Sequence, residues 1–277
     1  ATNSNIQQAV DAILAVDPTG ATAVGTYGFI SNFNTTQVTD MNELFYTSNY
    51  ANSQFNADIS GWDVSNVTTM RRMFMNLLNF NQDISGWDVS SVTDMRETFH
   101  RARKFNQPIG SWNVSNVTTM EKMFRDMTDM NIALNNWDVS NVTNMQEMFY
   151  ACPSFDQDLD QWDVSNVPSM REMFRSCSIF NGDVSTWDVS GVGDFSRMFD
   201  RAKLFNQDVS GWDTGSAFSI QRMFAGTEDF NQDISGWDIS NLSGNGLNEL
   251  FDGAESFNQD ISGWDISHLT QLNGVFD

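Results

Sequence analysis

The sequence predicts an α/β repeat fold, a solenoid of about ten 25-residue coils with a helix across its N-terminal end. Two observations predict the repeat. Eight tryptophans, from Trp62 to Trp237, are spaced 25 residues apart, and Trp264 follows after 27. Close copies of residues 81–90, which read Asn-Gln-Asp-Ile-Ser-Gly-Trp-Asp-Val-Ser, surround them. A fixed period of this length indicates stacked units that bury their apolar sides against their neighbours.

The helix is predicted from residues 1–32, which lie outside the repeat. Apolar residues recur there at helical spacing, Asn3, Ser4 or Asn5 can serve as the N-cap, and Pro18 ends the pattern. The apolar positions are Ile6, Ala9, Val10, Ile13 and Leu14. Because the end of a solenoid exposes core and unpaired backbone, we expect this amphipathic helix to cap it.

A short helix is predicted in every repeat. Counted from each Trp as position 1, positions 9, 12 and 13 are apolar, as in Met70, Met73 and Phe74. This i, i+3, i+4 pattern places all three side chains on one helical face, and Thr68 before them is a suitable N-cap. Pro168 takes the Thr position in one copy, which fits the first turn of a helix. The Met and Phe columns are predicted to form the core.

The segment around each Trp predicts one or two short strands, because it is too short and too rich in Gly, Asn and Asp for a helix. One parallel strand and one short helix per coil is a leucine-rich-repeat-like architecture. A pure β-helix is the alternative. A weaker copy begins at Phe33, so two regions are expected: a cap and lead-in at 1–32, and the repeat array at 33–277, whose C-terminal end has no evident cap.

The repeat resembles a known family. Its unit, Trp-Asp-Val-Ser-Asn-Val-Thr with the following Met, Met-Phe and Phe-Asn-Gln-Asp-Ile-Ser, is similar to that of BspA-like leucine-rich-repeat surface proteins, in the subtype first catalogued as a domain of unknown function in mycoplasma lipoproteins. The resemblance covers residues 33–277, and residues 26–30 are also similar to the entry segment of such proteins. It implies a secreted or surface-anchored module, often part of a larger protein, that serves attachment and partner binding. It supplies no catalytic residues.

The composition excludes several partners. With a formal net charge of -22, the chain is not expected to bind nucleic acid or an anionic membrane. No apolar run is long enough to span a bilayer, and the N-terminus lacks the pattern of a signal peptide. The resemblance implies an extracellular or cell-surface location.

Two columns of the repeat are acidic and are the candidate binding residues. The first lies four residues before each Trp and is broken by Pro108 and Ala133; the second directly follows each Trp and has Asn113 in one copy. The favoured binding residues are Asp158, Asp183, Asp208 and Asp233 of the first column and Asp163, Asp188, Asp213 and Asp238 of the second. The neighbouring Asn column, which includes Asn81 and Asn106, is expected to form a hydrogen-bonded ladder.

Calcium is the one cofactor that these columns suggest, because stacked carboxylates repel unless cations or hydrogen bonds compensate them. The candidate ligands are Asp83, Asp88, Asp183, Asp208 and Asp233. Residues 81–88 resemble the start of an EF-hand loop, but Val92 stands where that loop needs a bidentate Glu. The favoured alternative is that each Asp accepts hydrogen bonds from its own turn.

Two cysteines, Cys152 and Cys177, occupy one position in neighbouring coils. Stacking brings them near disulfide range, so a disulfide is one interpretation and two buried thiols in place of alanine is the other.

All fourteen Lys and Arg residues lie at positions 10–18 of their repeats, so charge is segregated. An enzyme is not expected, because His100 and His268 are the only histidines and no nucleophile or phosphate-loop motif is present. We expect a recognition or adhesion module that binds a protein, peptide or glycan, with a structural spacer in a larger surface protein as the alternative. End-to-end self-association through the C-terminal coil is a further expectation.

Overall fold

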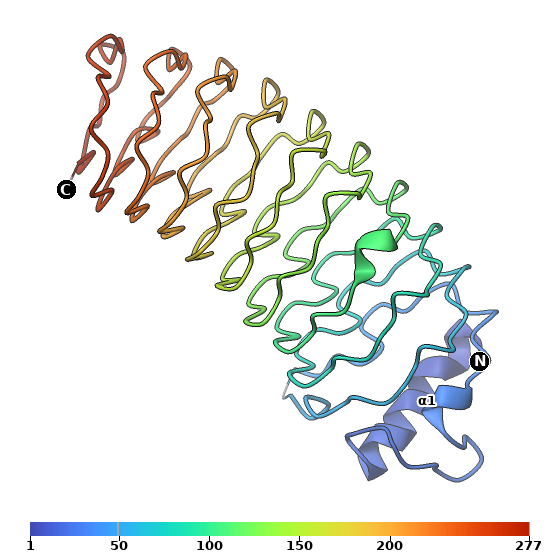
Figure 1. Ribbon diagram of the computed structural model, residues 1–277. Coiled ribbons are helices and arrows are strands. Elements are labelled where there is room, and N and C mark those ends of the chain that lie inside the picture. Colours follow the sequence, from blue (N-terminus) through green and yellow to red (C-terminus); the bar gives the residue numbers. More distant parts are fainter. Residues whose placement is uncertain (49, 277) are drawn as a thin grey trace.

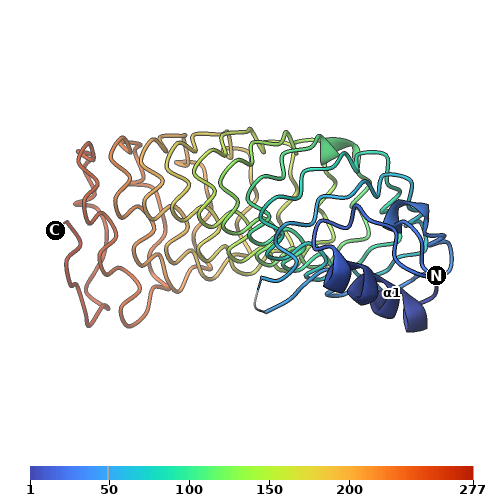
Figure 2. The same ribbon diagram turned by 90° about the horizontal axis from the view of Figure 1, so that it is seen from below.

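The structure of the protein is a computed structural model that describes residues 1–48 and 50–276. It is a row of coils that follow one another in sequence order along a gently curved axis (Figure 1). Helix α1, residues Asn3–Val16, lies at the N-terminal end of the row, and the C-terminus lies at the other end (Figure 2).

Helix α1 buries the five apolar residues that the sequence pattern indicates. Ile6, Val10, Ile13 and Leu14 belong to the same hydrophobic core as the coils, so the helix covers that core at its end. The N-cap is Thr2, one residue before the predicted candidates, and its N–H donates to Asn5 Oδ1 at 2.7 Å. The helix ends at Val16, ahead of Pro18.

The predicted α/β fold class was wrong. Within residues 1–48 and 50–276, α1 is the one α-helix, and two 3-10 helices accompany it, η1 at Ile30–Asn32 and η2 at Ile109–Ser111. No extended strand forms in these residues; successive coils share isolated parallel bridges such as Asp40 with Thr69 and Thr69 with Asp94. Neither a strand-plus-helix coil nor the alternative β-helix describes this molecule.

The predicted helical turn is replaced by a run of tight turns. The N–H groups of Met70, Arg72, Phe74 and Asn76 donate to carbonyl oxygens of the next coil at 2.9 to 3.0 Å, instead of to residues four positions back. Arg72 and Asn76 have φ of 55° and 66°, which interrupts a helix and lets consecutive turns form. Because every second N–H donates to a carbonyl oxygen of the neighbouring coil, a helix of one or two turns would add no hydrogen bonds that offset its nucleation cost.

The Thr column is a ladder between coils, not a set of helix caps. Both the N–H and the Oγ1 of Thr93 donate to the carbonyl oxygen of Thr68, at 2.9 and 3.2 Å, and Thr118 and Thr143 repeat this pairing.

The predicted strands fail because Asn and Asp side chains take the backbone N–H groups that a sheet would use. Asn106 N–H donates to Asn81 Oδ1 at 3.0 Å, and Ser85 N–H donates to Asp83 Oδ1 at 2.9 Å. Short polar side chains compete with sheet ladders in this way. The stretch therefore becomes a series of side-chain-capped turns.

The predicted core is confirmed. Met70, Met73 and Phe74 are fully buried, and their counterparts are buried as far as Phe251, whereas Leu272 and Phe276 of the last unit are exposed. Phe rings stack within and between coils, for example Phe74 with Phe80 at 4.5 Å and with Phe99 at 5.2 Å between ring centroids. Each buried Trp also donates Nε1–H to a carbonyl of the preceding coil, such as Trp137 to Ile109 at 3.1 Å. This hydrogen bond satisfies the indole and fixes the register between coils.

Candidate binding surfaces

Two rows of Asp side chains flank the Trp column, and we call them together the Asp edge. Almost all of these side chains are exposed; Asp183 is partly buried. The first row consists of Asp58, Asp83, Asp158, Asp183, Asp208, Asp233 and Asp260. The second row consists of Asp63, Asp88, Asp138, Asp163, Asp188, Asp213, Asp238 and Asp265.

The Asp side chains of both rows cap turns, except Asp158, whose Oδ1 accepts the N–H of Asp183 in the next coil. Asp63 Oδ1 accepts hydrogen bonds from the hydroxyl of Ser65 at 2.6 Å and from its N–H at 3.0 Å, and Asp188 does the same with Ser190. These hydrogen bonds favour the ionised carboxylate, so they hold the pKa of Asp63 and of Asp188 below the ordinary value. Asn113 caps its turn in the same way, with Oδ1 accepting from Ser115.

The Asp edge, as far as the structure describes it, lacks the ion pairs of a mixed-charge surface, although His268 acts to lower the pKa of Asp265. In the part of the chain that the structure describes, no Lys or Arg forms an ion pair with either row. Neighbouring carboxylates within a row repel one another. The hydrogen bonds from Ser235 lower the pKa of Asp233, and the charge of Asp260 acts more weakly to raise it. The edge is therefore a strip of uncompensated negative charge.

The spacing of this strip can be taken from the Trp column beside it. Ring centroids of Trp162, Trp187, Trp212 and Trp237 are 6.4, 6.3 and 6.4 Å apart in turn. Side chains on one face of an extended peptide repeat about every 6.6 to 6.8 Å. An extended segment along the edge can therefore place every second side chain opposite one coil.

The predicted calcium ligands do not come together as a metal site. Among the described residues, no group of three or more His, Cys, Asp or Glu side chains is placed to share a metal ion. Asp83 and Asp88 each cap a separate turn, through Ser85 and Ser90. This geometry matches the alternative in which Asp side chains satisfy the backbone.

The Asn column forms a continuous ladder. The Oδ1 of one Asn accepts the N–H of the equivalent residue in the next coil, from Asn56 to Asn81 and onward to Asn258, with Asp156 as one member. Gln side chains add to it: Gln107 Nε2 donates to the carbonyl and the Oδ1 of Asn81. The ladder uses the amide groups structurally.

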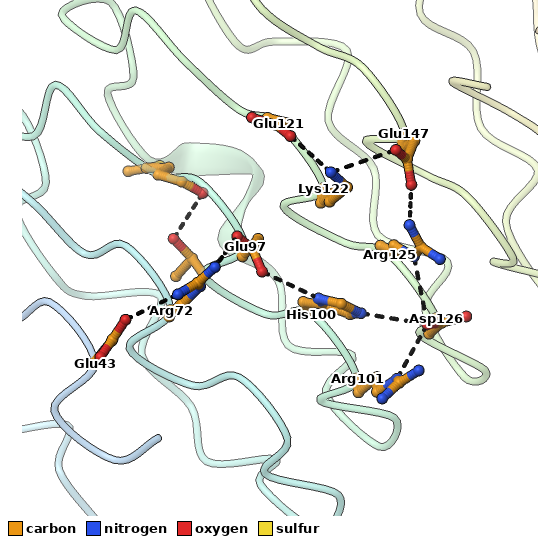
Figure 3. A network of polar contacts seen from close by, with 12 residues as sticks. Glu43, Arg72, Glu97, His100, Arg101, Glu121, Lys122, Arg125, Asp126 and Glu147 are labelled. Atoms are coloured by element: carbon orange, nitrogen blue, oxygen red, sulfur yellow. Dashed lines mark hydrogen bonds and ion pairs between the residues drawn. The ribbon is translucent and has the colours of Figure 1, made fainter. Parts of the chain in front are cut away.

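Positions 10–18 of the repeats, which we call the turn face, carry charges of both signs that pair with one another. Ten basic residues form ion pairs there, and Figure 3 shows the part around His100. They are Arg72, Arg96, Arg101, Lys122, Arg125, Arg171, Arg175, Arg201, Lys203 and Arg222. Most partners lie in a neighbouring coil, so the pairs join coils.

His100 lies at the centre of this network, with its side chain only 10% exposed. Its Nδ1 is 3.6 Å from Glu97 Oε2 and its Nε2 is 3.3 Å from Asp126 Oδ2 (Figure 3). Hydrogen bonds from His100 and Arg72 lower the pKa of Glu97 to about 2. Burial acts to raise the pKa of Asp126, but His100 and Arg101 lower it to about 2.

A second cluster surrounds Asp200, whose side chain is 1% exposed. The Nε atoms of Arg175 and Arg222 are 3.2 and 3.6 Å from Asp200 Oδ2, yet neither carboxylate oxygen has a well-aligned hydrogen bond. Burial raises the pKa of Asp200 in spite of these arginines. Desolvation outweighs attraction here because the geometry of the pairs is poor.

Sequence reasoning missed the individual members of the turn-face network. It located all basic residues in one segment of the repeat, but it did not single out Glu97, Asp126 or Asp200. It also missed Tyr150, whose ring lies between Arg125 at 4.3 Å and Arg175 at 5.2 Å. The alternation of charges along position 11, in Glu43, Arg72 and Glu97, is the signal that indicates pairing between coils.

Cys152 and Cys177 are free thiols in this structure, and both are buried. Their Sγ atoms donate to the carbonyl oxygens of Phe124 and Phe149 at 2.9 and 2.8 Å. Burial raises the pKa of Cys177 to about 12 and that of Cys152 well above its ordinary value. Both are therefore protonated core residues, not a disulfide.

Within the described residues, no helix has the length and apolar character that a membrane span requires. Curated proteins give no match to this chain. A family model described as "Mycoplasma protein of unknown function, DUF285" matches residues 21–134, 118–228 and 180–277. The three matches together span residues 21–277, which includes the whole repeat array. The chain therefore belongs to the DUF285 family of repeat proteins.

Proposed function

We propose that the protein is a non-enzymatic recognition or adhesion module that acts outside the cell or on its surface and binds a cationic protein or peptide along the Asp edge. One observation carries the proposal: ten of the fourteen Lys and Arg residues form ion pairs on the turn face, whereas the fifteen Asp side chains of the two rows form none with Lys or Arg among the described residues. A surface of one sign that is left unpaired attracts the opposite sign.

Three features support a protein or peptide over a glycan or an anionic surface. The edge is negative along most of its length, so anionic glycans are repelled. It is linear, and its Trp spacing of 6.3 to 6.4 Å is close to the side-chain repeat of an extended chain. The resemblance to BspA-like surface proteins favours attachment as the biological role.

The alternative is a structural spacer with no ligand of its own. The continuous hydrophobic core, which runs from Ile6 to Phe251, supports it because such a core makes a stiff rod. The two functions differ in one respect: only a binding module depends on the charge of the Asp edge.

The test uses a fluorescein-labelled peptide of about 18 residues, with Lys at every second position and Ser between, so that one Lys faces each coil. We expect the protein to bind it, measured by fluorescence anisotropy at moderate salt. The triple variant Asp183→Asn, Asp208→Asn, Asp233→Asn should weaken binding by about tenfold, because several surface pairs of up to about 1 kcal/mol each are lost.

A control variant removes the same charge elsewhere: Asp11→Asn, Asp129→Asn and Glu255→Gln, which are exposed and lie outside both rows. It should change affinity by less than about twofold. Equal losses in both triple variants would show that binding follows net charge alone, and an absence of binding would favour the spacer.

A further inference from the structure

The first Asp row is interrupted at one place, and the interruption is also hollow. Pro108 and Ala133 stand in two successive coils where the other coils have Asp. The coil that contains Pro108 also has Asn113 instead of Asp in the second row. Between the two coils lies a shallow hollow of about 330 Å³, lined by these two residues together with Asn106, Gly110, Asn131 and Ile132.

The local backbone explains the hollow. Pro108 directly precedes the 3-10 helix η2 at Ile109–Ser111 (green in Figure 1). Gly110 lies so close to the next coil that a Cβ atom there would be 2.3 Å from the carbonyl oxygen of Ala133. The coils therefore touch at Gly110, while the small side chain of Ala133 leaves space beside Pro108. The 3-10 helix η1 holds the equivalent position directly before Phe33, but among the described coils that contain a Trp, this is the one with a 3-10 helix there.

Resting on the proposed function, we propose that this notch sets the sequence of the partner. An extended cationic segment along the first row meets carboxylates at Asp58 and Asp83, an uncharged notch where Pro108 and Ala133 replace Asp in two coils, and then five more carboxylates from Asp158 to Asp260. At one facing side chain per coil, the matching segment carries two basic residues, two uncharged apolar residues and five basic residues at alternate positions. The two apolar side chains occupy the hollow at Pro108 and Ala133.

The chemistry favours this pattern over an unbroken run of basic residues. A Lys or Arg opposite Pro108 or Ala133 has no carboxylate of the first row to pair with. Its charge also loses water of hydration against the apolar side chains of Pro108 and Ala133, which costs free energy. An aliphatic side chain at the same place covers apolar atoms. The notch therefore discriminates between partners of equal net charge, which the acidic rows alone do not.

The experiment compares two peptides of the same composition, each with seven Lys and two Leu at alternate positions and Ser between. In the patterned peptide the two Leu residues follow the second Lys, and in the end-blocked peptide they follow the seventh. Each peptide is also made with its sequence reversed, because the partner can run along the row in either direction. We expect one direction of the patterned peptide to bind about five- to tenfold more tightly than either end-blocked peptide, as two misplaced surface contacts predict.

The double variant Pro108→Asp, Ala133→Asp restores the common residue in both coils, so it should fold. Its preference should shift toward a peptide with nine evenly spaced Lys and away from the patterned one. A melting curve checks its fold, and Ala133→Asp alone serves if the double variant melts early. Equal affinity for patterned and end-blocked peptides would overturn the notch while leaving the proposed function intact; no binding of any Lys peptide would overturn both.

Discussion

The Asp edge and the turn face use the same kinds of charged residue in opposite ways. On the turn face, Glu97 and Asp126 are mostly buried and contact Arg72, His100 and Arg101 in neighbouring coils. On the Asp edge, carboxylates such as Asp63 and Asp188 are exposed and bond only to the Ser of their own turn. The difference indicates that one surface holds the coils together and the other leaves its charge available to a partner.

The largest expected difference between the two surfaces is in the free energy of unfolding, when one carboxylate on each surface is replaced by its amide. Glu97→Gln removes one of the two charged partners of Arg72 and of His100 in a partly buried site, and we expect the free energy of unfolding to fall by about 2 kcal/mol. Asp188→Asn should change it by less than about 0.5 kcal/mol, since Asn113 already caps the same turn in another coil. Urea denaturation followed by Trp fluorescence measures both. Equal losses would remove the distinction between the surfaces.

The turn-face network also predicts part of the dependence of stability on pH. The folded-state pKa values of Glu97 and Asp126 are about 2, below their ordinary values of 4.5 and 3.8. A lowered carboxyl pKa contributes stability that is complete above the unfolded-state pKa and is lost as pH falls toward the folded-state pKa. Stability should therefore fall between about pH 4.5 and pH 2, and the variant Glu97→Gln, Asp126→Asn should show a flatter decline there. An unchanged slope would contradict the network.

The backbone of the turn face gives a smaller test. Ala151 has φ of 56°, and Gly226 holds the same repeat position with φ of 66°. A left-handed conformation costs a non-Gly residue about 1 kcal/mol, so Ala151→Gly should stabilise the protein by up to about that amount. Gly226→Ala should destabilise it similarly, although a Cβ there meets no atom closer than 3.4 Å. Thermal unfolding of the two variants should shift in opposite directions; shifts of the same sign would show that φ is not the cause.

Calcium should have the smallest effect. Because the Asp side chains of the rows, Asp158 apart, cap their own turns and no described group of three carboxylates faces one point, added calcium or a chelator should leave the melting temperature unchanged. A calcium-dependent rise of several degrees would return these Asp residues to a structural metal role.

Much of this organisation could be read from the sequence, because a repeat turns each position into a column. The period, the apolar columns, the Asn ladder and the segregation of Arg and Lys follow from spacing alone. The coil's secondary structure did not. Met70, Met73 and Phe74 fit a helical face, but consecutive turns with positive φ at Arg72 produce the same face.

The secondary structure of the coil was not predicted because it depends on hydrogen bonds between coils, which the residue pattern of a single coil does not reveal. The N–H of Arg72 donates to Arg96 of the next coil, and the N–H of Asn106 donates to the side chain of Asn81. Both partners are about 25 residues away, so local propensity does not predict them. The hollow at Pro108 was likewise unforeseen, although the sequence marked Pro108 and Ala133 as breaks in the acidic column.

The central claim is that the turn face stabilises the fold and the Asp edge binds, and one paired measurement tests it. Unfolding free energy and affinity for the alternating Lys peptide are measured for Glu97→Gln and for the triple variant Asp183→Asn, Asp208→Asn, Asp233→Asn. We expect Glu97→Gln to lose stability and keep its affinity, and the triple variant to keep its stability within about 1 kcal/mol and lose affinity about tenfold. A triple variant that unfolds easily but still binds the peptide would contradict the claim.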